Sequence, residues 1–456
     1  MMSLQTAAAF AQGTLDGADG ELLRVVTDSR DIRPGDLFVA LKGERFDAHD
    51  FVADVLAKGA IAAVVRQDFV LPGAALIRVA DTRLALGQLA AGWCASLPLK
   101  RIGITGSNGK TTVKEMVASI LRSHAGADAV LATAGNFNND IGVPLTLLQL
   151  TTAHRYAVIE MGMNHHGELR YLTGLLRPQV ALVNNAMRAH VGHFAHTADV
   201  ARAKAEIFEG LVADGVAVLN ADDANLAIFD SAAASHTQLR FGLSAGADIT
   251  ARAIELLPLH SRFVLVTLQG EVEVTLPTPG EHNVRNALAA TSVALALNVP
   301  LTDIAAGLAA LLGVKGRLQQ KTAAHGVTVI DDTYNANPDS MKAGLEVLSR
   351  LPAPRWFVMG DIGELGATAP ALHAEVGAYA RTLGIDVLLG VGELTGEAVA
   401  AFGAGAQQFA TLEALQTYLD GHLPAGTSVL VKGSRFMHME RVVDHLTAVT
   451  QQNKGI

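Results

Sequence analysis

The stretch from Gly103 to Thr112, GITGSNGKTT, groups glycines, a lysine and hydroxyl side chains as a phosphate-holding loop does. The strict phosphate-loop pattern is Gly, four residues and then Gly-Lys-Ser/Thr, and here Ile104 stands where the first Gly is expected. The surroundings still fit a nucleotide loop, because an apolar strand-like run ends at Thr105 and a helix-like run follows. We therefore interpret the stretch as a nucleotide loop rather than a chance Gly-Lys-Thr turn.

The residue types in this loop suit the binding of a nucleoside triphosphate. Gly106 and Gly109 allow backbone N–H groups to turn toward phosphate, and Lys110 adds a full positive charge at a helix N-terminus. Thr111 can offer its hydroxyl to Mg²⁺. GTPases need an Asn-Lys-x-Asp motif to recognise the base, and the C-terminal QNKGI lacks its Asp, so the sequence favours ATP.

A nucleotide site also needs ligands for its metal ion. Glu160 ends the apolar run YAVIE, where its carboxylate either holds Mg²⁺ or is simply solvated, and position alone leaves both open. His190, His193 and His196 follow another apolar run, but no cysteine or acidic pattern completes a zinc site. We interpret His193 and His196 as loop or helix surface. The sequence alone also places Lys204, in ARAKAEIF, among ordinary surface lysines.

Strand-like runs alternate with helix-like runs along most of the chain, which predicts an α/β protein with mainly parallel sheets. At 456 residues the chain is long enough for about three domains. We place them at 1–97, 98–315 and 316–456. Residues 239–280 switch to alternating strands, which predicts an antiparallel extension of the central sheet, and an Ala-rich helix is expected over 282–297.

Loops with unusual polar sequences follow the strands predicted in the third domain. They read DDTYNANPDS, GDIGELG and KGSRF. In open α/β sheets, ligands bind outside the carboxyl ends of the strands. One edge of this domain is therefore expected to be functional.

Composition excludes several classes of protein. The formal net charge of −9 argues against broad nucleic-acid binding, although a few local cations still suffice for an anionic small ligand. Cys94 is the single cysteine, so no intramolecular disulfide can form, and the chain fits a reducing cytoplasm. The sequence contains no run of about 18 apolar residues, so no membrane span is predicted, and its N-terminus makes a poor signal peptide.

Eight stretches, in this order, resemble the Mur ligases of bacterial peptidoglycan synthesis. They are TGSNGKTT, GNFNNDIGVPLTLL, VIEMG, AHVGHF, AKAEIF, GEHNVRNALAA, GRLQ and DDTYNANPDSM. The family's loop has the form Thr-Gly-x-x-Gly-Lys-Thr/Ser, so the missing first Gly is a family feature. The resemblance implies a small uridine-diphosphate-binding N-terminal domain, a central P-loop ATPase domain and a C-terminal Rossmann-like domain.

Carried over residue by residue, the resemblance implies an ATP site. The phosphate loop comprises Gly106, Ser107, Asn108, Gly109, Lys110, Thr111 and Thr112. The adenine contact falls on Asn283, beside His282 and Asn286. The ribose contact falls on Asp332, and the γ-phosphate contact on Arg317. Thr111 and Glu160 match the ligands of one Mg²⁺, and His190 the ligand of a second. Lys204 matches a lysine that several family members carry as a carbamate, here a further metal ligand. The implied catalytic residues are Lys110, Glu160, His190, Lys204 and Arg317.

Other stretches match substrate contacts of the family. Ser29 and Arg30 match contacts to the uridine nucleotide, to which we add Asn136, Asn138 and Asn139. The loop with Asn335, Asn337 and Pro338 is assigned to the tripeptide and dipeptide ends. GNFNNDIGVPLTLL and DDTYNANPDSM resemble the family branch that joins D-alanyl-D-alanine to UDP-N-acetylmuramoyl-tripeptide.

The resemblance therefore implies a cytoplasmic, monomeric, ATP- and Mg²⁺-dependent amide ligase that works through an acyl phosphate. Three alternatives are weighed against it: the ligase that adds the third amino acid, a folylpolyglutamate synthetase, and a nucleotide-binding scaffold without catalysis. The YNANP loop argues against the first, and TDSR against the second. A scaffold is expected to have lost Lys110, Glu160, His190 or Arg317, and all are present. Whether the tripeptide carries diaminopimelate or lysine stays open.

Overall fold

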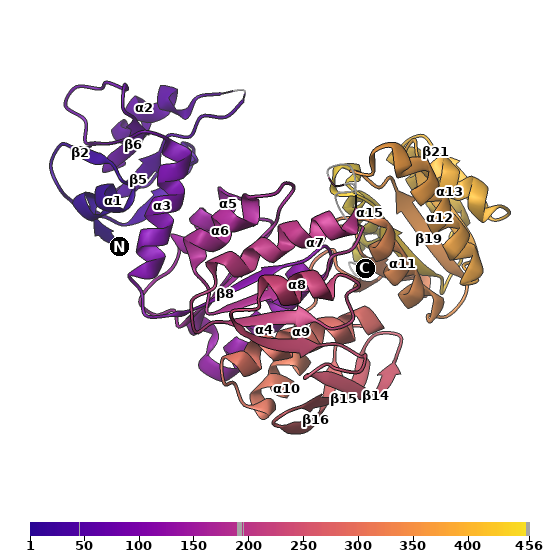
Figure 1. Ribbon diagram of the computed structural model, residues 1–456. Coiled ribbons are helices and arrows are strands. Elements are labelled where there is room, and N and C mark those ends of the chain that lie inside the picture. Colours follow the sequence, from indigo (N-terminus) through magenta and orange to yellow (C-terminus); the bar gives the residue numbers. More distant parts are fainter. Residues whose placement is uncertain (45, 189–193, 195, 453–456) are drawn as a thin grey trace.

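The computed structural model describes residues 1–44, 46–188, 194 and 196–452, which fold into three α/β domains in chain order (Figure 1). The predicted boundary after residue 97 falls between α3 (Thr82–Ala95) and β8 (Lys100–Thr105). The predicted boundary after residue 315 falls between α10 (Leu301–Ala309) and β17 (Gln319–Thr322).

The N-terminal domain has a five-stranded sheet of order β2-β7-β6-β5-β4, in which only β2 runs antiparallel to its neighbour. Helices α1 and α3 cover one face and α2 covers the other. Its further elements are β1 (Met2–Ser3), α1 (Leu4–Phe10), β2 (Thr14–Asp16), β3 (Glu21–Leu22), β4 (Arg24–Val26), β5 (Asp36–Val39), α2 (Val52–Ala57), β6 (Ala62–Arg66) and β7 (Leu76–Val79).

The central domain is built on a fully parallel six-stranded sheet of order β13-β12-β11-β8-β10-β9. Helices α4, α9 and α10 pack on one face, and α5, α6 and α7 pack on the other. Its further elements are α4 (Lys110–Ala125), β9 (Val130–Ala132), α5 (Gly142–Leu147), β10 (Tyr156–Glu160), α6 (Glu168–Leu176), β11 (Val180–Val183), α7 (Thr197–Ala205), β12 (Val216–Asn220), α8 (Leu226–Ala232), β13 (Thr237–Phe241) and α9 (Glu281–Ala296). All five residues of β10 are buried, as expected for a strand covered on both faces.

Helix α4 shows why the sequence folds this way next to the phosphate loop. Its buried apolar residues recur at helical spacing and face the sheet: Val113, Met116, Val117, Ile120 and Leu121. Each such side chain contributes about 1.5–3 kcal/mol when it leaves water. Gly109 and Gly126, both with positive φ, mark the two ends of the helix.

The prediction for residues 239–280 was partly wrong. Strand β13 joins the parallel sheet as its edge. The alternating residues after it form a separate antiparallel sheet of β14 (Thr250–Leu256), β15 (Ser261–Thr267) and β16 (Gly270–Leu276). The alternation specifies one buried face, which here packs against α9 and α10 instead of extending the sheet.

The C-terminal domain has a six-stranded sheet of order β17-β18-β22-β19-β20-β21, parallel except for β17. Helices α11, α12 and α13 cover one face, while α14 and α15 cover the other. Its further elements are β18 (Thr328–Asp331), α11 (Pro338–Ser349), β19 (Arg355–Gly360), α12 (Ala369–Thr382), β20 (Val387–Val391), α13 (Thr395–Phe402), β21 (Ala406–Phe409), α14 (Leu412–His422), β22 (Ser428–Lys432) and α15 (Glu440–Gln452). The two edge strands, β17 and β21, have the sequences QQKT and AQQF, which carry little apolar pattern.

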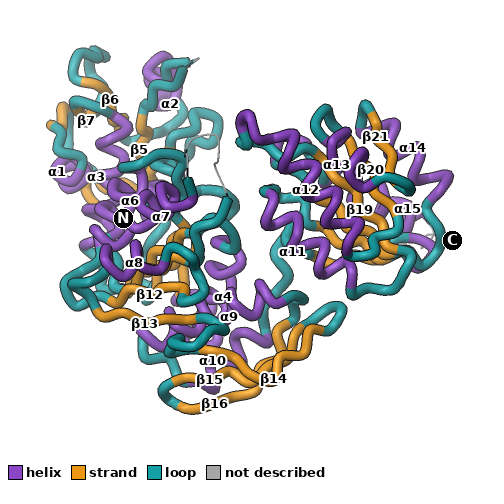
Figure 2. The backbone as a smooth tube through the Cα atoms, turned by 45° about the vertical axis from the view of Figure 1, so that its right-hand side comes forward, coloured by secondary structure: helices purple, strands orange, loops and turns teal. Residues whose placement is uncertain are grey.

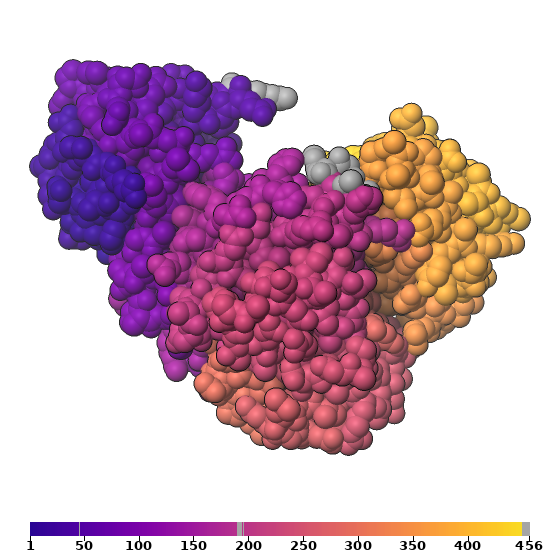
Figure 3. Space-filling view, viewed as in Figure 1, coloured from indigo at the N-terminus to yellow at the C-terminus, as the bar shows by residue number. Residues whose placement is uncertain are grey.

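The three domains surround an open space. Figure 3 shows the N-terminal and C-terminal domains on either side of a hollow above the central domain. Figure 2 shows α11 on the side of the C-terminal domain that faces the central domain. Within the described residues, no helix combines the length and apolar character needed to cross a bilayer.

Candidate active site

A cavity of about 1490 Å³ opens where the three domains meet. The N-terminal domain contributes the first turn of α3, and the central domain contributes the loops that follow β8, β10 and β11. The C-terminal domain contributes the linker before β17 and the loops that follow β18, β19 and β22. Carboxyl ends of parallel strands from two sheets therefore face one another, the arrangement in which α/β proteins bind ligands.

The phosphate loop lines the centre of this cavity. Gly109 has φ 78°, and a Cβ there would lie 2.5 Å from Asn286 Oδ1, so only glycine fits. Helix α4 starts at Lys110, and the first N–H groups of a helix have no partner within it. The Lys110 ammonium donates to the carbonyls of Gly106 at 2.6 Å and Ser107 at 3.3 Å. Burial, followed by the positive charge of Arg317, lowers the pKa of Lys110, while Glu160 acts in the opposite direction.

Glu160 stands beside the loop, held by hydrogen bonds on both carboxylate oxygens. The Thr111 hydroxyl donates to Oε2 at 2.9 Å, and the Asn138 amide donates to Oε1 at 2.8 Å. The residue is 2% exposed, so the solvated alternative is wrong. A carboxylate and a hydroxyl this close to a phosphate loop fit Mg²⁺, which takes one or two carboxylates and completes its shell with phosphates and water. The described residues include no cluster of three His, Cys, Asp or Glu, and a site of this kind needs none.

Lys204 is buried, at 1% exposure, and the interpretation as a surface lysine is wrong. Ala201, Ala205 and Phe208 are buried with it on the inner side of α7 and the turn that follows. Burial, and then the positive charge of Lys110, lowers the pKa of Lys204 well below its ordinary value. No hydrogen bond joins its ammonium to another described residue. The buried Lys204 amine therefore loses its proton more readily than an ordinary lysine, and it lies close enough to the phosphate loop to interact with the charge of Lys110.

The three histidines can be compared with the structure only in part. His190 and His193 lie outside the described residues. His196 is exposed and occupies the N-cap position just before α7, where its side chain forms no capping hydrogen bond. The prediction that it belongs to the surface is confirmed.

In the C-terminal domain, Arg317 lines the cavity, whereas Asp332 is buried and does not belong to the cavity wall. Asp332 accepts a hydrogen bond from the buried Lys432 ammonium at 2.6 Å and another from the Leu318 backbone at 3.2 Å. Burial lowers the pKa of Lys432 although Asp332 opposes the shift. Lys432 was not predicted from the sequence. The pattern that could have indicated it is its position directly after the apolar run SVLV.

The residues assigned to adenine lie behind the phosphate loop. The Asn283 amide donates to the Pro279 carbonyl at 2.8 Å, and the Asn286 amide donates to Asn283 Oδ1 at 3.1 Å. The Asn184 amide joins this network to the loop, donating to Asn286 Oδ1 and to the Asn108 carbonyl. Asn108 belongs to the cavity wall. The other three residues of this network, Asn184, Asn283 and Asn286, do not. Burial lowers the pKa of the neighbouring His282 to about 4, so its ring is neutral at pH 7.

The DDTYNANPDS loop reaches the phosphate loop. Asn337 caps α11 in a reciprocal pair with Ser340, and its amide donates to Asn108 Oδ1 at 2.6 Å. Pro338 is the buried first residue of α11. The Asn335 carbonyl accepts a hydrogen bond from Lys432 at 3.0 Å. Asn335 and Asn337 line the cavity, and Pro338 supports the helix start behind them.

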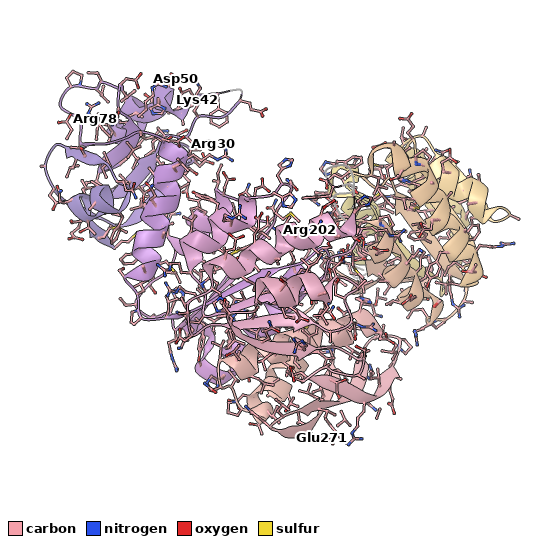
Figure 4. All side chains as sticks on the ribbon, viewed as in Figure 1. Arg30, Lys42, Asp50, Arg78, Arg202 and Glu271 are labelled. Carbon is pink, nitrogen blue, oxygen red and sulfur yellow. The ribbon has the colours of Figure 1, made fainter. Side chains whose placement is uncertain are left out.

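The predicted uridine contacts divide into two groups. Ser29 and Arg30 lie outside the cavity wall, and Arg30 is an exposed side chain that pairs with Asp28 at 2.6 Å (Figure 4). Three asparagines, Asn136, Asn138 and Asn139, line the cavity. The amide of Asn138 is engaged by Glu160, and Asn139 Oδ1 caps the start of α5 at the Gly142 N–H, 2.8 Å away.

An ion cluster that the sequence did not reveal joins the central and C-terminal domains. The Arg188 guanidinium donates to Asp339 at 2.6 Å and to both carboxylate oxygens of Glu375 at 3.0 and 3.1 Å. Lys342 adds a second cation at 2.5 Å from Glu375. These neighbouring cations lower the pKa of Glu375 to about 2. Arg188 lies after β11, next to the undescribed residues 189–193. Its partners lie more than 150 positions away in the chain, so no local sequence pattern predicts the cluster.

We expect Arg188→Ala to loosen the C-terminal domain and to raise the KM for ATP. Its partners are partly exposed, so each pair contributes no more than about 1 kcal/mol, and the change acts on domain position rather than on folding. Small-angle scattering with and without a non-hydrolysable ATP analogue is the measurement. The variant should be more extended without nucleotide, and the analogue should compact both proteins.

The control for this prediction is Arg170→Ala. Arg170 also makes two bonds to one glutamate, Glu209, but both residues belong to the central domain. Its scattering profile should match that of the wild type. An Arg188→Ala profile identical to that of the wild type, with and without the analogue, would count against the cluster as a domain contact.

Comparisons with known proteins agree with this architecture. Residues 23–93, 104–294 and 316–435 match, in order, the profiles "Mur ligase family, catalytic domain", "Mur ligase middle domain" and "Mur ligase, glutamate ligase domain". The chain is 46% identical to UDP-N-acetylmuramoyl-tripeptide--D-alanyl-D-alanine ligase of Escherichia coli K12, over 94% of this chain and 95% of that one.

Solved structures are similar over the same length. The crystal structure of MurF from Acinetobacter baumannii has a TM-score of 0.90 and 43% identity, covering 97% of this chain and 98% of that one. MurF ligase from Thermotoga maritima, solved in complex with ADP, has a TM-score of 0.83 and 26% identity, covering 94% and 98%. Fold, motif order and relatives thus agree, and the chain belongs to the Mur ligase family.

Proposed function

We propose that this protein is the ATP-dependent ligase that joins D-alanyl-D-alanine to UDP-N-acetylmuramoyl-tripeptide, forming the pentapeptide precursor of peptidoglycan. The observation that carries the proposal is the cavity between three domains, with the phosphate loop and Glu160 at its centre. A space shared by three domains can bring a nucleotide, a uridine-linked peptide and a dipeptide together. The relatives of similar sequence bear the name of this ligase.

The first step activates the tripeptide. Its terminal carboxylate attacks the γ-phosphorus of ATP, the bond to the β-phosphate oxygen breaks, and ADP and an acyl phosphate result. Two anions must be brought together, so catalysis consists mainly of positioning and charge neutralisation. We assign Lys110 and the N-terminus of α4 to the transferred phosphate on the central-domain side, and Arg317 on the side of the linker, because Lys110 and Arg317 line the same cavity.

Magnesium supplies a hard cation that neutralises the phosphate oxygens. Thr111 and Glu160 would hold one ion, with Asn138 and Thr133 fixing the position of Glu160 through hydrogen bonds of 2.8 and 2.9 Å. His190 and Lys204, the latter as a carbamate, are our candidates for the second ion. The Asn283 network and Asp332 are our candidates for adenine and ribose.

The second step forms the amide bond. The dipeptide amine attacks the acyl carbon, and the resulting tetrahedral intermediate expels phosphate. Asn335 and Asn337 lie where the C-terminal domain meets the phosphate loop, so their loop is our candidate for holding the two peptide ends. Ser29 and Arg30 are our candidates for holding the uridine nucleotide on the N-terminal domain.

The test is a turnover assay that measures ADP. Release should require ATP, Mg²⁺, D-alanyl-D-alanine and a UDP-tripeptide together, with diaminopimelate and lysine tripeptides compared in parallel. Release that depends on diaminopimelate or lysine as the incoming amine would indicate the preceding ligase. Release that depends on glutamate and a folate would indicate a folylpolyglutamate synthetase. Nucleotide binding without any amine-dependent release would leave only a scaffold.

We also propose that the protein acts as a monomer in the cytoplasm. Cys94 is the single cysteine, and burial raises the pKa of its thiol to about 11, so the thiol is unreactive and offers no disulfide link to a second copy of the chain. Sedimentation at assay concentration is the measurement, and a stable dimer would count against the monomer.

A further inference from the structure

The Arg317 guanidinium is unusual among the arginines that line the cavity, because it has no hydrogen-bond partner among the described residues. Its Nε is buried and unpaired. Arg83, Arg188 and Arg435, which also line the cavity, are each paired with a carboxylate. A buried donor without an acceptor is costly unless a ligand supplies the acceptor.

The face of this guanidinium is nevertheless occupied. Its Cζ lies 4.2 Å from the centre of the Tyr334 ring, the shortest cation–aromatic contact recorded among the described residues. Tyr334 itself lines the cavity, and its hydroxyl forms no hydrogen bond with a described residue. The ring therefore contacts Arg317 through its face and competes for none of its N–H groups.

The loop that carries Tyr334 is fixed on both sides. The Thr333 hydroxyl donates to Asp331 at 2.6 Å, and the Asn335 carbonyl accepts from Lys432 at 3.0 Å. The Tyr334 N–H donates to the Gly316 carbonyl at 3.1 Å, which joins this loop to the linker that carries Arg317. Gly316 has φ 69°, and a Cβ there would lie 3.1 Å from the Tyr334 nitrogen, so the close approach requires glycine.

We propose that Tyr334 is a positioning residue that holds the Arg317 guanidinium flat, with its N–H edge directed at the phosphoryl group transferred in the first step. All five guanidinium donors lie in the plane of the group. Stacking on an aromatic face therefore fixes the orientation of that plane while it leaves every donor for phosphate oxygens. A hydrogen-bonding partner would fix the same orientation only by using some of those donors.

The proposal rests on the ligase reaction proposed above and predicts a specific pattern in kcat. Tyr334→Leu keeps apolar bulk but removes the aromatic face, and it should lower kcat roughly 3- to 30-fold. Tyr334→Phe keeps the face and should retain most of the turnover. The melting temperature should change little in both variants, because the Tyr334 ring lines the cavity rather than the core.

The decisive measurement is a double-mutant cycle with Arg317→Ala. If Tyr334 acts through Arg317, adding Tyr334→Leu to Arg317→Ala should change kcat less than twofold. The matched control is Tyr418→Leu, which removes a ring stacked on His422 at 4.1 Å, outside the cavity wall. It should leave kcat unchanged.

Three results would overturn the proposal. They are a folded Tyr334→Leu variant with normal kcat, a Tyr334→Phe variant as impaired as Tyr334→Leu, and single effects that simply multiply in the double variant. The second result would assign the role to the hydroxyl, and the third would make Tyr334 independent of Arg317. An inactive wild type would instead refute the ligase reaction itself, so the two failures are distinguishable.

Discussion

Lys110→Ala should abolish turnover while the protein stays folded. The Lys110 ammonium lies on the carbonyls of its own loop, 2.6 Å from that of Gly106, where it is placed to meet the phosphates of a bound nucleotide. Its removal deletes one full charge from a partly enclosed site. Loss of one preorganised electrostatic contact of this kind costs about 3 kcal/mol, roughly a 100-fold loss in kcat, and often more. ADP release under saturating substrates is the measurement.

The control for Lys110 lies on the same strand–loop unit. Lys100 is exposed at the first residue of β8, at the other end of the strand, so Lys100→Ala should be fully active. Thermal melts monitored by circular dichroism should show that both variants are folded. The side chain of Lys110 contributes little apolar packing, because its head group faces the cavity rather than the core. A folded Lys110→Ala variant with near-normal kcat would contradict the assignment of the phosphate loop.

Lys204→Ala should lose most of its activity, and Lys204→Arg should not recover it. A free ammonium beside Mg²⁺ would repel the metal, whereas the carbamate formed from CO₂ is an anion with two hard oxygens. The carbamate forms when the lone pair of the neutral amine attacks CO₂ and the nitrogen then releases a proton. A protonated lysine has no lone pair and cannot react. Burial favours the neutral form by lowering the pKa of Lys204 well below its ordinary value. Arginine keeps its charge and forms no such adduct.

Chemical rescue makes the Lys204 prediction specific. A small carboxylate such as acetate should restore part of the activity of Lys204→Ala but none of that of Lys204→Arg, whose side chain fills the space. Protein equilibrated with ¹³C-labelled bicarbonate should show a carbamate carbon by NMR that is missing in both variants. Arg202→Ala, on the same helix but exposed and paired with Asp199 at 2.7 Å, is the matched control and should be fully active (Figure 4). Full activity in Lys204→Arg would contradict the carbamate.

The sequence predicted much of the local structure correctly. The parallel strands of the central domain, the α4 helix and the phosphate loop between them could be predicted because each depends on neighbours in the chain. Apolar spacing specifies a buried helix face, and Gly109-Lys110-Thr111 specifies a turn and a helix start within three residues. The order of the motifs was sufficient to predict the family, which the comparisons confirm.

Predictions about single side chains were weaker wherever burial decided the role. Glu160 could have been solvated, and Lys204 was placed on the surface, yet both are at most 2% exposed. The sequence around each residue shows that one face of the element is apolar. It does not show that other elements close over the polar side chain, and that closure is what makes a carboxylate a candidate metal ligand and an amine a candidate for modification.

What the sequence by itself determined is the set of elements and the chemistry each carries at its end: a phosphate loop after β8, a carboxylate at the end of β10 and polar loops after the C-terminal strands. Only the tertiary structure decided which of these ends meet. Asn337 reaches Asn108, 229 positions away, and Arg188 reaches Glu375, 187 positions away. Arg317 meets the Tyr334 ring because Gly316 lets two backbone segments approach closely. Contacts of this kind depend on how two separately folded sheets pack and on the path of the linker between them, and neither leaves a periodic pattern in the chain.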